Sequence, residues 1–268
     1  MNLFSLNGKT VVLTGAGGFF GRYFTRALLE NGARVILIEQ SLAALKFFSQ
    51  AHEDRYESRF LDLYNRQAAK ECYEKILSAN RVDILVNNAF DFSQKTGFNT
   101  PDGRLENATF EQLQASFEAG IWWAIQATQT FGLAMKKQGS GSVINICSMY
   151  GVVVPSPDLY EGTDKFNPPG YSMAKAGLLQ FTKYAASFLS PEVRVNAISP
   201  GVIPNTESQG PNAITENNPV LERLLKKIIL KRMGHPSDLT GALVFLASDA
   251  SSYMTGQNII IDGGLTVT

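Results

Sequence analysis

The stretch TGAGGFFG at residues 14–21 decides the expected fold of this chain. It follows the apolar run VVL (11–13) directly and leads into RYFTRALLENGA (22–33), which has helical periodicity. Glycines between a buried strand and a helix let the backbone turn tightly and approach a phosphate, while the helix N-terminus adds unpaired N–H groups. The stretch therefore predicts a strand, a phosphate-binding turn and a helix, with an ordinary tight turn as the alternative.

The rest of the chain repeats the alternation of strand and helix. Helical segments separate seven short runs rich in Val and Ile: TVVLT (10–14), RVILIE (34–39), SRFL (58–61), VDILVNN (82–88), SVINIC (142–147), VRVNAIS (193–199) and NIIID (258–262). Continuous apolar runs are typical of strands buried on both faces. We therefore expect an α/β fold, a Rossmann-like doubly wound parallel sheet of about seven strands with helices on both faces. Residues 1–268 are expected to form one domain.

Two long segments, 152–170 and 201–219, interrupt this rhythm and are rich in Pro, Gly, Asn and Asp. Loops of this length in a compact domain are usually lids or binding loops, and disorder is the alternative. We expect both to be substrate loops.

Composition narrows the possible partners. Lys plus Arg and Asp plus Glu number 24 each, so no bulk charge attracts nucleic acid or an anionic membrane. No apolar run is long enough for a membrane helix, and the N-terminus lacks an export signal. Cys72 and Cys147 lie in apolar segments and are expected to be reduced thiols, and the two histidines have no metal-ligand spacing. A cytoplasmic protein with a small-molecule partner and no metal is expected.

Glu39 closes the second strand, where a dinucleotide-binding pattern requires a carboxylate. Such a carboxylate accepts hydrogen bonds from ribose hydroxyls and repels a 2′-phosphate, which favours NAD over NADP. No basic residue lies inside 14–21 to hold that phosphate, although Arg22 follows directly. A solvated glutamate at a strand end is the alternative.

Further motifs follow in order: NNA (87–89), NICSMYG (145–151), YSMAK (171–175), RVNAISPG (194–201) and GQNIIIDGG (256–264). With the glycine turn they resemble the short-chain dehydrogenase/reductase family, in its short single-domain branch, over essentially the whole chain. The resemblance implies an NAD(P)-dependent oxidoreductase that assembles as a dimer or tetramer. It also implies a set of cofactor-binding residues, namely Gly15, Gly18, Phe20, Gly21, Glu39, Asp62, Leu63, Asn88, Ala89, Tyr171, Lys175, Pro200 and Ile203.

The predicted catalytic residues are Ser148, Tyr171 and Lys175. Tyr171 and Lys175 are four positions apart and share one face of a helix. A tyrosine that moves a proton near neutral pH needs its pKa of about 10 lowered, and a nearby ammonium favours the phenolate. Ser148 ends a strand and would donate a hydrogen bond to the substrate oxygen. Tyr-x-x-x-Lys alone is a common accident on surface helices, but the surrounding motifs favour catalysis.

The sequence departs from the family at four places. Gly120 stands where the family usually has an asparagine that helps hold a water of the proton relay, and Phe90 replaces the last glycine of NNAG. Gly15, Gly18 and Gly21, with Phe19 between them, have the glycine spacing of the sugar-nucleotide-modifying branch. The segment between Ser148 and Tyr171 is longer than usual and polar. Its flanks resemble a subgroup linked to flagellin modification and nonulosonic-acid sugar biosynthesis.

The sequence therefore predicts an NAD(H)-dependent oxidoreductase that interconverts a secondary alcohol and a ketone, on a polar sugar-type substrate. A reductase of a lipid, steroid or acyl carbonyl is the first alternative. Gly120 motivates a second, a non-catalytic NAD-binding regulatory protein. The glycine spacing motivates a third, an epimerase or dehydratase that returns the hydride to its substrate.

Overall fold

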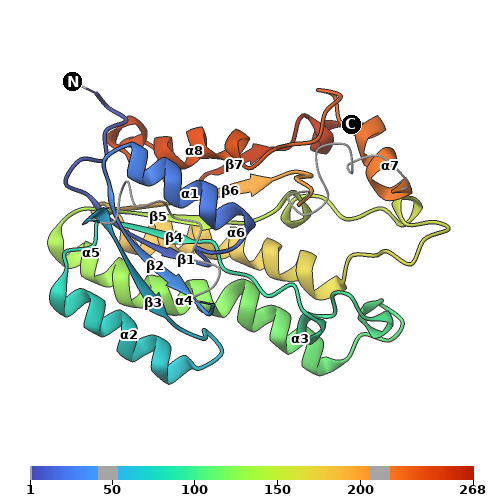
Figure 1. The fold of residues 1–268 in the computed structure, drawn as a ribbon, viewed down its shortest axis with the longest axis horizontal. Coiled ribbons are helices and arrows are strands. Elements are labelled where there is room, and N and C mark those ends of the chain that lie inside the picture. Colours follow the sequence, from blue (N-terminus) through green and yellow to red (C-terminus); the bar gives the residue numbers. More distant parts are fainter. Residues whose placement is uncertain (1, 42–53, 206–217) are drawn as a thin grey trace.

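The computed structural model describes residues 2–41, 54–205 and 218–268. Seven strands form one sheet, in the order β3-β2-β1-β4-β5-β6-β7, and every neighbouring pair is parallel (Figure 1). The strands are β1 (Thr10–Thr14), β2 (Arg34–Glu39), β3 (Tyr56–Phe60), β4 (Ile84–Asn87), β5 (Gly141–Ile146), β6 (Val193–Pro200) and β7 (Asn258–Ile261). This confirms the predicted doubly wound fold, and the order reverses between β1 and β4, where such sheets bind ligands.

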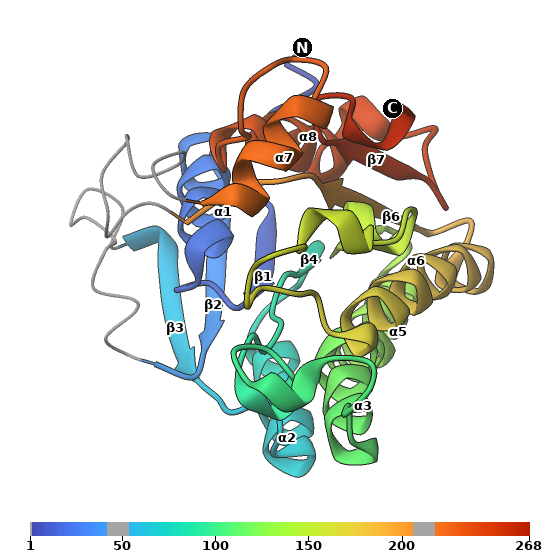
Figure 2. The same ribbon diagram turned by 90° about the vertical axis from the view of Figure 1, so that its right-hand side faces the viewer.

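Helices cover both faces of the sheet (Figures 1 and 2). Along β1 the side chains alternate between two hydrophobic cores, with Val12 in one and Val11 and Leu13 in the other. The core of Val11 and Leu13 includes α1 (Phe19–Glu30) and α8 (Ser237–Ala247). The core of Val12 contains residues of α2 (Arg66–Ala79), α4 (Trp123–Ala127), α5 (Leu133–Gln138) and α6 (Pro169–Leu189).

A long helical rod lies between β4 and β5. It begins with α3 (Phe110–Phe117), and two π-helical turns, Glu118–Trp122 and Thr128–Gly132, connect α3 to α4 and α4 to α5. A π-helical turn inserts an extra residue and shifts the faces of the helix that follow it. Gly120, the position of the missing asparagine, lies in the first of these turns.

A chain of buried polar side chains fixes α6 against the sheet. The Asn87 amide on β4 donates to Asn145 Oδ1 on β5 at 2.8 Å, and the Asn145 amide donates to Thr182 Oγ1 on α6 at 2.9 Å. Asn145 is fully buried and Thr182 is 1% exposed, so breaking either bond would leave an unpaired polar group in the core. These bonds set where α6 presents Tyr171 and Lys175.

Candidate active site

The glycine turn packs too closely for side chains. Gly15 has a φ of +65°, and a Cβ there would lie 2.9 Å from Ala89 Cα. A Cβ on Gly21 would overlap the Gly15 carbonyl oxygen and lie 2.6 Å from that of Ala16. Gly18 is the residue before the first turn of α1, and its φ of −67° is open to any residue. The glycines at 15 and 21 are therefore required by geometry, because they allow α1 to start directly against β1.

The end of β4 is tied to this turn. Asn88 Nδ2 donates to the carbonyl oxygens of Thr14 at 3.1 Å and Gly15 at 2.9 Å. The Thr14 hydroxyl oxygen accepts from the backbone N–H groups of Asn88 and Ala89. The predicted residues Gly15, Asn88 and Ala89 thus meet at the point where the strand order reverses.

Glu39 reaches the same turn from the end of β2. Its Oε2 accepts from the Gly17 N–H at 2.9 Å, and its Oε1 accepts from the Gln40 N–H at 2.8 Å. Asp62 is exposed beyond β3 and accepts from the Tyr64 N–H, whereas the Leu63 side chain is buried in the core. The Leu63 side chain packs in the core, so it is not exposed for contact with a ligand.

The turn fits a dinucleotide. Helix α1 begins without a side-chain hydrogen bond at its N-cap and without an acidic residue in its first turn. Its first N–H groups and the positive end of its dipole are thus available to a pyrophosphate, with Glu39 beside them for a ribose. The ring centroids of Phe20 and Phe24 are 6.0 Å apart, and Phe20 packs against the hydrophobic core that contains Phe24. Phe20 therefore helps to hold the start of α1 against this core.

The structure brings Ser148, Tyr171 and Lys175 together at the carboxyl end of β5. Ser148 follows β5 in extended conformation, is 7% exposed, and lies close enough to the Tyr171 side chain to affect its pKa. Lys175 lies one helical turn after Tyr171, with Nζ 5.8 Å from the centroid of the Tyr171 ring. Nζ donates to the Ile146 carbonyl at 2.9 Å, and the side chain is 4% exposed.

Burial dominates the protonation of this pair in the protein alone. It raises the pKa of Tyr171 to about 12, although the neighbouring Ser148 side chain opposes the shift. It lowers the pKa of Lys175 to about 8, while the nearby Cys147 thiol opposes that shift. The expected lowering of the Tyr171 pKa by Lys175 is thus not found in this geometry, because burial disfavours the phenolate and Lys175, which has the lower pKa, is already neutral at the pH where Tyr171 ionises.

Three phenylalanines that the sequence analysis did not assign to the site surround Tyr171. The rings of Phe90, Phe92 and Phe98 lie 5.1, 5.8 and 5.5 Å from its ring centroid. They also contact one another, and Phe92 is 54% exposed. The signal was present in FDFSQKTGF (90–98), which follows NNA directly, but nothing local shows that these rings turn toward the catalytic helix. We call Phe90, Phe92 and Phe98 the aromatic wall.

The segment 152–170 packs on α7 (Pro219–Lys227). Leu159 is buried against Val220 and Leu224, and Arg223 donates to the carbonyl oxygens of Leu159 and Glu161 at 3.0 and 2.7 Å. The Asp158 carboxylate accepts a hydrogen bond from Ser156 and forms an ion pair with Lys227 at 3.3 Å, and both contacts lower its pKa. The Asp158 charge is therefore directed to α7, and the polarity of this segment is weaker evidence for a polar substrate than its composition suggested. In the second predicted loop, 206–217 lie outside the described residues.

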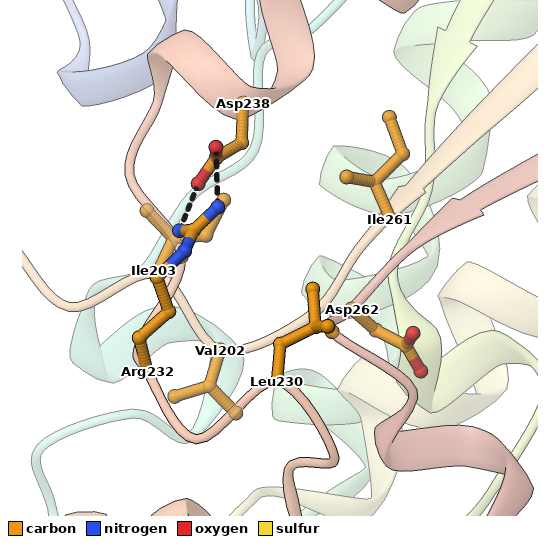
Figure 3. Close-up of a pocket in the computed structure, with 9 residues that line it drawn as sticks. Val202, Ile203, Leu230, Arg232, Asp238, Ile261 and Asp262 are labelled. Carbon is orange, nitrogen blue, oxygen red and sulfur yellow. Dashed lines mark hydrogen bonds and ion pairs between the residues drawn. The ribbon is translucent and has the colours of Figure 1, made fainter.

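A cavity of about 160 Å³ lies where β6 and β7 end (Figure 3). Val202 and Ile203 line it together with Ile261, and the paired Arg232 and Asp238 close one side through two hydrogen bonds. The lining of this cavity includes one predicted cofactor-binding residue, Ile203, which lies shortly after Pro200 at the end of β6. Across the described parts of the chain, no group of three His, Cys, Asp or Glu residues is placed to hold a metal ion.

This arrangement of glycine turn, strand-end serine and helical Tyr-Lys pair defines a class of dinucleotide-dependent oxidoreductases. A family model described as Enoyl-(Acyl carrier protein) reductase matches residues 18–266. The chain belongs to the short-chain dehydrogenase/reductase family and is an oxidoreductase of CH–OH or carbonyl groups.

Curated relatives act on different substrates. Galactitol 2-dehydrogenase (L-tagatose-forming) of Cereibacter sphaeroides is 32% identical over 99% of this chain and 98% of its own. A 3-oxoacyl-[acyl-carrier-protein] reductase of Thermotoga maritima is also 32% identical, over 98% of this chain and 99% of its own. Sugar-alcohol and acyl-carbonyl enzymes are thus equally similar in sequence.

Solved structures share the fold and carry either nicotinamide dinucleotide. A short-chain dehydrogenase from Leptospira borgpetersenii with bound NAD+ is 30% identical, with a TM-score of 0.81 over 99% of this chain and 96% of that chain. A putative NAD(P)-dependent gluconate 5-dehydrogenase from Beutenbergia cavernae with bound NADP is 28% identical, with a TM-score of 0.82 over both full chains.

Proposed function

We propose that this protein is an NAD(H)-dependent oxidoreductase that interconverts a secondary alcohol and a ketone on a polar, sugar-type substrate. The observation that carries the proposal is the meeting of Ser148, Tyr171 and Lys175 at the end of β5, beside the glycine turn. The three side chains would have different roles in the reaction.

A bound nicotinamide ring would supply or accept the hydride. Ser148 Oγ donates a hydrogen bond to the substrate oxygen and so polarises a carbonyl or orients an alcohol. The Tyr171 hydroxyl gives its proton to that oxygen in reduction and takes one from it in oxidation. Lys175, held by the Ile146 carbonyl at 2.9 Å, places its charge within one helical turn of Tyr171 and offers N–H donors to a ribose.

Glu39 supports a preference for NAD over NADP. Its carboxylate accepts from Gly17 in the glycine turn and so lies beside the predicted position of the adenosine ribose. Replacing Glu39 with alanine is expected to reduce the ratio of kcat/KM for NAD to that for NADP about tenfold or more, because repulsion of the 2′-phosphate is lost. Steady-state kinetics with both cofactors measures the ratio.

Glu39→Gln is the matched control, since it keeps an acceptor for the Gly17 N–H and removes only the charge. If charge repulsion sets the preference, the two variants relax it to a similar degree. A ratio that is unchanged in both would assign cofactor choice to other residues, with Arg22 the next to examine.

The substrate class rests on two kinds of support. The galactitol dehydrogenase relative favours a ligand with many hydroxyl groups, and so do the neighbouring side chains of Tyr150 and Tyr160, which affect each other's pKa. The exposed half of Phe92 in the aromatic wall and the 80% exposed Val154 favour the alternative, an acyl or other apolar carbonyl. We propose a sugar-type substrate because it is compatible with both observations. The carbon atoms of a polyol can pack against aromatic rings, and its hydroxyl groups can hydrogen-bond with polar side chains.

A substrate screen tests this choice. The purified protein is incubated with NADH and free keto-sugars, nucleotide-linked keto-sugars, or apolar and acyl ketones, and NADH oxidation is measured. Turnover of a keto-sugar is expected, and turnover of apolar ketones alone would reject the sugar proposal. The nucleotide-linked keto-sugars test the predicted resemblance to the subgroup linked to flagellin modification and nonulosonic-acid sugar biosynthesis. Tightly bound NAD that is unchanged after substrate conversion would identify an epimerase or dehydratase.

We further propose a cytoplasmic homo-oligomer, a dimer or tetramer. Cys72 and Cys147 are free thiols, as a reducing compartment maintains them. Tyr184 and Phe188 stack on the outer face of α6 and are 66% and 56% exposed, an apolar surface that association would cover. In the described residues, no helix is long and apolar enough to cross a membrane.

A further inference from the structure

Two departures from the family pattern, Phe90 and Gly120, meet in space. A Cβ on Gly120 would lie 3.2 Å from Phe90 Cε2 and 2.5 Å from Ala174 Cβ. The first π-helical turn therefore has no room for a side chain at position 120, because α6 and the Phe90 ring already occupy it. The ring of Phe90 therefore lies directly beside the position that a side chain at residue 120 would enter.

From this position the Phe90 ring contacts both members of the catalytic pair. Its ring meets that of Tyr171 edge to face, with centroids 5.1 Å apart and an interplanar angle of 83°. Lys175 Nζ lies over the same ring, 5.0 Å from its centroid. Edge-to-face rings and a cation over an aromatic face are both attractive arrangements. One side chain thus touches the proton donor, its neighbouring ammonium and the helix turn behind them.

The Lys175 ammonium has three N–H donors, and one of them is used by the Ile146 carbonyl. The Phe90 ring covers one side of this ammonium. Water held there would need polar partners, and neither a phenylalanine ring nor Gly120 has a side-chain donor or acceptor. The titratable groups that face Nζ are Tyr171 from α6 and the Cys147 thiol beyond β5.

We propose that Phe90 is a positioning residue, which is seated in the space left by Gly120 and holds Tyr171 and Lys175 in a dry, fixed arrangement in place of a water-binding asparagine. This inference rests on the proposed catalytic role of that pair. It predicts that proton exchange with Tyr171 proceeds from the substrate side of the pair, since the Phe90 ring closes the side that it covers.

The proposal has a signature in the titration of Lys175. Burial lowers the pKa of this ammonium, and the Phe90 ring is part of what buries it. Replacing Phe90 with glycine admits water and raises the pKa toward that of a free lysine, whereas loss of the cation–π contact alone would lower it. Solvation is expected to prevail because Lys175 is 4% exposed and desolvation is the main cause of its pKa shift.

The experiment follows the pKa of Lys175 by NMR in protein labelled with ¹³C at the lysine side chains, without substrate. The signal is assigned by its absence from Lys175→Met. Phe90→Gly is expected to raise the pKa by about one unit or more. Phe90→Leu, which keeps an apolar side chain in the space, is expected to stay close to the native value. Phe92→Gly, which removes a ring that touches Tyr171 from the exposed side, is expected to change it by less than half as much.

An unchanged pKa in Phe90→Gly, or an equal rise in Phe92→Gly, would overturn the proposal. Thermal melting and NAD binding verify that each variant is folded, and if Phe90→Gly does not fold, Phe90→Ala takes its place. With a substrate from the screen, Phe90→Gly is expected to lower kcat at least tenfold with a smaller change in KM, and Phe90→Leu to recover part of the loss. The titration uses no substrate, so its result does not depend on the proposed function. The Tyr171→Phe variant tests that function separately.

Discussion

Replacing Tyr171 with phenylalanine is expected to lower kcat about 10²- to 10⁴-fold, the usual contribution of a positioned acid or base. The variant keeps the ring that packs against the aromatic wall and removes only the hydroxyl. The loss should therefore appear in kcat while NAD binding is retained. Turnover is measured as the change in NADH absorbance, and cofactor affinity by fluorescence titration.

Tyr184→Phe is the matched control for this prediction. Tyr184 lies on the same helix, is 66% exposed, and should lose its hydroxyl without effect on turnover. Undiminished turnover in Tyr171→Phe would refute the proposed mechanism. No turnover by the native protein of any alcohol or ketone, with intact NAD binding, would favour the non-catalytic alternative that Gly120 raised.

Replacing Gly21 with alanine is expected to weaken NAD binding roughly 100-fold, which corresponds to about 2.7 kcal/mol. The added Cβ would overlap the Gly15 carbonyl oxygen and lie 2.6 Å from that of Ala16, so α1 must move away from the glycine turn. The first N–H groups of α1 move with it and lose their aim at the pyrophosphate. Isothermal titration with NAD measures the effect.

Gly241→Ala provides the comparison, because a Cβ at this position of α8 meets no atom within 4 Å. This variant should leave NAD affinity unchanged, which would show that a glycine-to-alanine change does not by itself weaken NAD binding. If Gly21→Ala is unfolded by circular dichroism, Gly18→Ala is the milder variant, with its Cβ 3.2 Å from the Gly15 oxygen. Native affinity in folded Gly21→Ala would place the cofactor elsewhere.

Much of the site was predictable because its signals are local in sequence. Tyr171 and Lys175 share a helix face by their spacing of four, and Glu39 ends a strand whose neighbours carry the glycine turn. The parallel sheet then brings the carboxyl ends of β1, β2, β4 and β5 to one edge. Residues predicted from separate motifs meet there because all parallel strands point the same way.

The pKa values and the segment 152–170 were not predictable in the same way. Desolvation depends on everything packed around a group, so the ordinary pKa of Tyr171 gave no sign that burial raises it to about 12. Likewise the segment 152–170 is polar in sequence, but the fold places Lys227 beside its Asp158 at 3.3 Å. Asp158 and Lys227 are 69 positions apart in the sequence, so no local sequence pattern indicates that they form a pair.

The sequence alone determined the class of this protein: its strands follow from their apolar runs and its turn from the glycines, and the predicted chemistry rests on Ser148, Tyr171 and Lys175. Only the tertiary structure decided that Phe90 and Gly120, two unrelated departures along the chain, are one packing arrangement around the catalytic pair. The physical reason is that local patterns specify backbone conformation and facing, whereas the space beside a side chain is set by elements that meet only in the folded molecule.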